Sequence, residues 1–169
     1  MKTQNIAKYG MLIALAFIFS YIEAMIPVPM PAPGMKLGLA NLVSVVGLYT
    51  VGVLGTMGVA LIRIVLVGFT FGNAFSMWYG LAGGITSLVL MLLCKRTGWF
   101  SILGVSVVGG IGHNLGQLLF ASWTLNQKDI MYYFPVLAIG GLAAGAVIGI
   151  LGGLVTERIK KGIGRLKKS

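Results

Sequence analysis

Six apolar stretches occupy most of this chain and constrain its fold more than any other feature. They cover residues 10–26, 37–51, 53–71, 75–93, 100–123 and 132–155. A helix of about 20 apolar residues crosses the hydrocarbon of a bilayer. Only 9% of the 169 residues are charged, whereas soluble domains carry about 25%. We therefore expect an all-α integral membrane protein, in which residues 1–169 form a single six-helix transmembrane domain.

The positive charges predict the orientation of these helices. Ten of the thirteen Lys and Arg residues lie before the first stretch, between the fourth and fifth, or after the sixth. The positive-inside rule places such segments in the cytoplasm, so both termini are expected there. The net charge of +10 is then mainly a consequence of topology, and no nucleic-acid partner is expected.

Arg63 is the most unusual polar residue, because it lies near the middle of the third stretch. Ionisable groups inside a bilayer are costly and mark functional sites by default. None of the three carboxylates in the chain falls at its depth. Its guanidinium is expected either to pair with amides and water or to contact an anionic ligand.

Under this topology the other polar candidates gather in the outer halves of the helices or in the outer loops. With Arg63 they are expected to line a cavity that opens outward and binds substrate. The alternative for each is helix packing, capping or an interfacial aromatic belt. The candidates are Glu23, Lys36, Asn41, Asn73, Tyr79, His113, Asn114 and Gln117.

Small residues recur at a spacing of four in the first stretch. Gly10 and Ala14 form one such pair, and Ala16 and Ser20 form another. Small residues let helix backbones approach closely in membranes, so this helix is a candidate interface for a partner subunit.

Several catalytic chemistries have no basis in the sequence. No phosphate-binding G-x-x-x-x-G-K-[ST] motif is present, so the chain is not expected to hydrolyse ATP. Asp129 is the only aspartate, Cys94 the only cysteine and His113 the only histidine. Paired aspartates that hold magnesium for diphosphate chemistry are therefore excluded. We expect no enzyme activity, no cofactor and no metal site.

Five segments carry a resemblance to a known family. They are PGMKLGLANLVSVVGLYTVG (33–52), RIVLVGFTFGN (63–73), LAGGITSLV (81–89), GGIGHNLGQLL (109–119) and YYFPVLAIGGLAAG (132–145). In this order they resemble the Gx transporter family, which is also described as heptaprenyl diphosphate synthase component I. The family is similar to the S components of energy-coupling factor (ECF) transporters.

The resemblance implies a six-helix S-component-like bundle in a bacterial cytoplasmic membrane. It implies uptake of a small organic solute, vitamin-like or precursor-like, with a transmembrane subunit and cytoplasmic ATPases as partners. It also places Gly10, Ala14, Ala16 and Ser20 where S components present small residues to that transmembrane partner. The alternative is a non-catalytic membrane subunit associated with heptaprenyl diphosphate synthesis.

Overall fold

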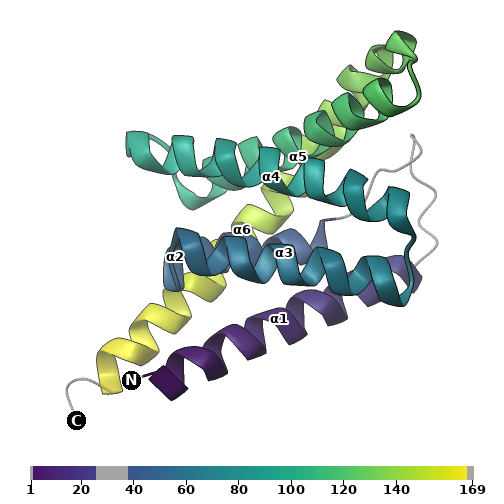
Figure 1. Cartoon of the computed structure of the whole chain (residues 1–169). Coiled ribbons are helices and arrows are strands. Elements are labelled where there is room, and N and C mark those ends of the chain that lie inside the picture. Colours follow the sequence, from purple (N-terminus) through teal and green to yellow (C-terminus); the bar gives the residue numbers. More distant parts are fainter. Residues whose placement is uncertain (1, 26–37, 167–169) are drawn as a thin grey trace.

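The computed structural model describes the backbone of residues 2–25 and 38–166, and the side chains of residues 6–25 and 38–162. The described part is helical throughout, as the sequence predicts (Figure 1). The helices are α1 (Lys2–Met25), α2 (Leu39–Thr50), α3 (Val53–Thr70), α4 (Ala74–Thr97), α5 (Ile102–Thr124), a 3-10 helix η1 (Lys128–Tyr133) and α6 (Phe134–Leu166).

Local signals set the helix boundaries. Gly38, Gly52 and Gly98 have positive φ angles, a conformation that glycine adopts without steric cost. The side chain of Asn73 accepts the backbone N–H of Ser76, whose hydroxyl accepts the Asn73 N–H in return. This reciprocal capping box fixes the start of α4.

Five of the six predicted membrane spans correspond to helices long and apolar enough to cross a bilayer. The exception is α2, whose 12 residues give a length of about 18 Å at 1.5 Å per residue, less than the hydrocarbon thickness of about 30 Å. Residues Val43 to Leu48 of this helix are all buried. No residue of α2 is exposed, so other helices cover most of its surface and a helix too short to span the hydrocarbon can be accommodated.

The last helix is longer than the sequence predicts. The 132–155 stretch begins in η1, and α6 continues past it to Leu166. Its final turns contain Glu, Arg and Lys, which are good helix formers. The helix therefore extends beyond the apolar stretch that defined the predicted span.

Five helices form a closed ring in the order α2, α6, α5, α4 and α3, and α1 lies outside it against α2 and α3. The N-terminal end of α1 and the C-terminal end of α6 lie on one side of the molecule, with the α2–α3 and α4–α5 turns on that side too (Figure 1). The C-terminal end of α1 and the turns that precede α4 and η1 lie on the other side. We call these two sides the terminal end and the loop end.

The α4–α5–α6 part of the ring is held by close backbone contact. Glycines of α6 pack directly on the α5 backbone, where a Cβ atom at Gly145 would lie 2.7 Å from Val107 Cα. A buried apolar cluster of Val45, Leu48, Met91, Val105 and Ile148 joins four helices of the ring. Three members of this cluster also line the cavity described next. The core therefore supports one wall of that cavity.

Candidate functional site: a polar cavity inside the helix ring

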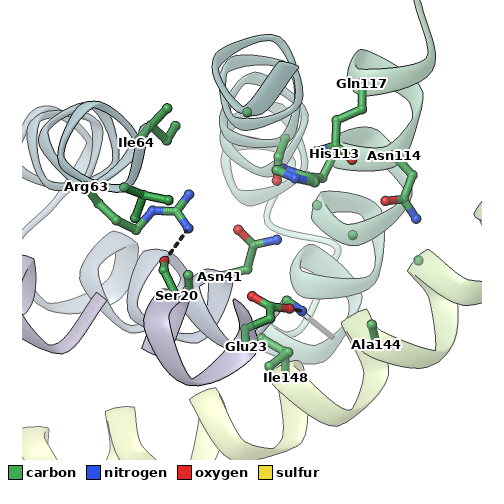
Figure 2. Close-up of a pocket in the computed structure, with 18 of the residues that line it drawn as sticks. Ser20, Glu23, Asn41, Arg63, Ile64, His113, Asn114, Gln117, Ala144 and Ile148 are labelled. Carbon is green, nitrogen blue, oxygen red and sulfur yellow. Dashed lines mark hydrogen bonds between the residues drawn. The ribbon is translucent and has the colours of Figure 1, made fainter. Parts of the chain in front are cut away.

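A cavity of about 350 Å³ lies inside the helix ring. Its lining comes from every α-helix of the bundle, with the C-terminal end of α1, the N-terminal end of α2 and the middle of α5 contributing most of its polar groups. Figure 2 shows side chains that approach this space from both sides. The volume falls within the range of about 300–1,000 Å³ typical of small-molecule sites.

Arg63 projects from α3 into this cavity (Figure 2). Its Nη1 donates a hydrogen bond of 3.3 Å to Ser20 Oγ, which itself donates to the Ala16 carbonyl at 2.9 Å. The Nε atom is buried and has no hydrogen-bond partner among the described residues. A guanidinium has five N–H donors, so Arg63 retains unused donors at the cavity wall.

Glu23 is the carboxylate that lines the cavity with Arg63. It acts on Arg63 through charge–charge attraction, while its Oε1 accepts the backbone N–H of Gly38 at 2.5 Å. This hydrogen bond connects the last turn of α1 to the residue before α2. Glu23 therefore contributes a negative charge to the cavity that holds Arg63 and fixes one edge of the site.

Amide side chains supply the remaining polar groups. Asn114 is 8% exposed, and its Nδ2 donates to the Leu137 carbonyl of α6 at 2.7 Å. Gln117 is 3% exposed, and neither it nor Asn41 has a side-chain hydrogen bond to another described residue. Both line the cavity, as His113 does. The amides of Asn41 and Gln117 can therefore hydrogen-bond to a ligand.

The remaining three predicted site residues differ in their relation to the cavity. Asn73 lines the cavity and also caps α4. Tyr79 does not belong to the lining; its ring stacks on Phe75 with centroids 5.9 Å apart. Lys36 lies outside the described residues. The depth of Tyr79 in its span predicts a place at the cavity, but its side chain lies on a face of α4 that does not line the cavity.

The small residues of α1 do not share one face. Gly10 and Ala14 are exposed, and a Cβ at Gly10 would meet no atom within 4 Å. Ala16 and Ser20 are instead 2% and 8% exposed and face the bundle. Gly10 and Ala14 are therefore accessible to a partner, whereas Ser20 orients Arg63.

Sequence reasoning missed part of the lining. Ser87 of α4, Ser106 of α5 and Met91 are buried at the cavity, and the partly exposed Met77 also lines it. Small hydroxyl residues inside apolar stretches were a usable signal, since polar groups in such stretches need partners. The methionines gave no signal, because they are apolar like their neighbours.

Comparison with solved structures places this fold in a known class. It is similar to the structure described as "Structure and mechanism of the S component of a bacterial ECF transporter", with a TM-score of 0.67, 16% sequence identity and coverage of 100% of both chains. The sequence model of the family described as heptaprenyl diphosphate synthase component I matches residues 12–155. The chain belongs to that family and is a multi-pass membrane protein. No curated protein matches it in sequence.

Proposed function

We propose that this chain is the substrate-binding, S-component-like subunit of a membrane transporter that takes up a small organic solute. Two findings support the proposal: the fold similarity over the full length of both chains and the polar cavity inside the helix ring. Movement of the solute would be driven by a separate transmembrane subunit and cytoplasmic ATPases. The chain itself acts in binding and is not an enzyme.

The observation that carries the proposal is the placement of Arg63. A cation with a buried, unpartnered Nε at a cavity wall is costly in a membrane protein unless a ligand uses it. Arginine binds carboxylate or carbonyl oxygens through parallel N–H donors. Arg63 would therefore hold an anionic or carbonyl group of the solute, while Asn41 and Gln117 hydrogen-bond to other polar atoms.

The charge distribution supports an outward-facing cavity. Five cations lie in the last turns of α4 and α6, which reach the terminal end of the bundle (Figure 1): Lys95, Arg96, Arg158, Lys160 and Lys161. The positive-inside rule would place that end in the cytoplasm of a bacterial cell. The polar groups of the cavity near the loop end would then face the outside, where a solute enters.

The partner surface would lie on the exposed face of α1. Gly10 and Ala14 are exposed there, and they are the two predicted positions that we retain for contact with a transmembrane subunit. Ala16 and Ser20 are turned inward, so we do not assign them to this interface.

Native mass spectrometry of the gently purified protein tests the proposal, because it detects retained solute and retained subunits together. Once the solute is identified, its affinity is measured for wild type and for R63A. Loss of one charge-assisted hydrogen bond predicts a weakening of about tenfold to a hundredfold. R96A is the matched control, since it removes an exposed cation at the opposite end.

Two results would contradict the proposal. Binding by R63A as tight as that of wild type would refute the assignment of the cavity. Recovery of the chain with a soluble prenyltransferase, and without solute or ATPases, would favour a non-catalytic synthase subunit; the family description names component I of heptaprenyl diphosphate synthase.

A further inference from the structure

Two lysines from different helices converge on one aromatic ring at the terminal end of the bundle. Lys95 Nζ of α4 lies 4.6 Å from the centroid of the Tyr49 ring, and Lys160 Nζ of α6 lies 5.8 Å from the same centroid. Tyr49 belongs to the last turn of α2. Three helices therefore meet at this point, and none of the three residues lines the polar cavity.

Lys95 is held in place by the backbone. Its Nζ donates a hydrogen bond of 2.5 Å to the Leu48 carbonyl, near the C-terminus of α2, where the helix dipole favours a positive charge. The side chain is half-buried. An ammonium fixed in this way differs from the solvated lysines of a disordered tail, because its position is set by the fold.

The convergence brings like charges together. The charge of Lys160 acts unfavourably on Lys95, and both ammonium groups face the same ring. Glu157, which is exposed, is the only carboxylate in the described part of this end of the molecule. Two cations at one site without a fixed counter-charge are stabilised when an anion binds between or beside them.

We propose that Tyr49, Lys95 and Lys160 form a binding site for the headgroup phosphate of an anionic phospholipid. Basic pockets between membrane helices on the cytoplasmic side bind such headgroups. The aromatic residues after α4 favour a lipid over a soluble anion: Trp99 and Phe100 are 90% and 44% exposed and have the composition of a membrane–water interface. Acyl chains beside them would leave the phosphate at the two lysines.

Trp99 provides a local probe for the test. The chain has three tryptophans, and the other two, Trp78 and Trp123, lie near the loop end of α4 and α5. In a W78F/W123F background the fluorescence therefore comes from Trp99 alone, which follows Lys95 by four residues. The protein is reconstituted in phosphatidylcholine vesicles containing equal mole fractions of either brominated phosphatidylglycerol or brominated phosphatidylcholine, and quenching of Trp99 is compared.

We expect brominated phosphatidylglycerol to quench Trp99 more strongly than brominated phosphatidylcholine. K95Q/K160Q should lower the apparent affinity for phosphatidylglycerol on the order of tenfold, whereas K95R/K160R should retain it. R96Q/K161Q is the matched control, because it removes two positive charges from the same end without changing the groups at Tyr49.

Three outcomes would overturn the proposal. In the W78F/W123F background with both lysines intact, equal quenching by the two lipids would show no enrichment, and this measurement does not depend on the folding of any lysine variant. An equal loss of affinity for phosphatidylglycerol in R96Q/K161Q and K95Q/K160Q would show that the lipid is attracted only by the diffuse positive charge of the surface. Displacement of phosphatidylglycerol by inorganic phosphate, but not by chloride at the same ionic strength, would identify a soluble anion as the ligand.

Discussion

Gly149 offers a direct test of the close contact between α5 and α6. A Cβ atom at this position would lie 2.8 Å from Leu103 Cα and 3.0 Å from Ser106 Cβ. Carbon atoms pack at about 3.5–4.0 Å, so in G149A the two helices must separate locally by roughly 0.7 Å or more. Overpacking of this kind costs about 1–3 kcal/mol.

Gly153 is the matched control, because it lies one turn further along the same helix and a Cβ there would meet no atom within 4 Å. Both substitutions gain about 1 kcal/mol of helix propensity, which cancels in the comparison. G149A should therefore be less stable than G153A by about 1–3 kcal/mol.

The assay is reversible unfolding in mixed detergent micelles, followed by the fluorescence of the native tryptophans. The two variants are compared with wild type under the same conditions and without added solute. If G149A unfolds at the same detergent composition as G153A, or at a more denaturing one, the α5–α6 contact is not as close as the structure indicates.

Two further predictions concern polar groups near the cavity. N73A removes the capping box of α4 and should lower the unfolding free energy by about 0.5–2 kcal/mol, whereas N73S should retain most of it; equal stability of N73A and N73S would contradict the role of the cap. N114L removes the side-chain hydrogen bond to the Leu137 carbonyl and should cost about 0.5–1.5 kcal/mol, with faster amide hydrogen exchange in the first turns of α6. Unchanged stability and exchange would show that this hydrogen bond does not hold α6.

The candidate site was predictable in part, because polar residues in apolar stretches are rare enough to be counted. One cavity is lined by five of the predicted residues, as their depth predicted: Arg63, Asn41, His113, Asn114 and Gln117. The sequence could not place Tyr79, because depth along a helix does not state which face turns inward. In a soluble helix the polar face marks the outside, but lipid removes that signal.

The sequence also could not show which way Ser20 faces. Its spacing from Ala16 in the first stretch predicts a partner interface, yet Ser20 is buried and accepts a hydrogen bond from Arg63, 43 positions away in the chain. Such a contact depends on how α1 packs on α3. No spacing within α1 could indicate it.

By itself, the sequence determined that this protein is a membrane-embedded helical bundle with polar groups at a shared depth. Burying polar groups in lipid is costly, so a membrane-spanning chain must have long apolar stretches and few charged residues. The tertiary structure decided which of these groups meet. It closed five helices into a ring that includes the short α2, brought residues from all six α-helices to one cavity with Arg63, and turned Ser20 inward. Those outcomes depend on packing between segments that are distant in the chain. Hydropathy alone is compatible with several arrangements of the helices, and close glycine contacts and hydrogen bonds select one of them.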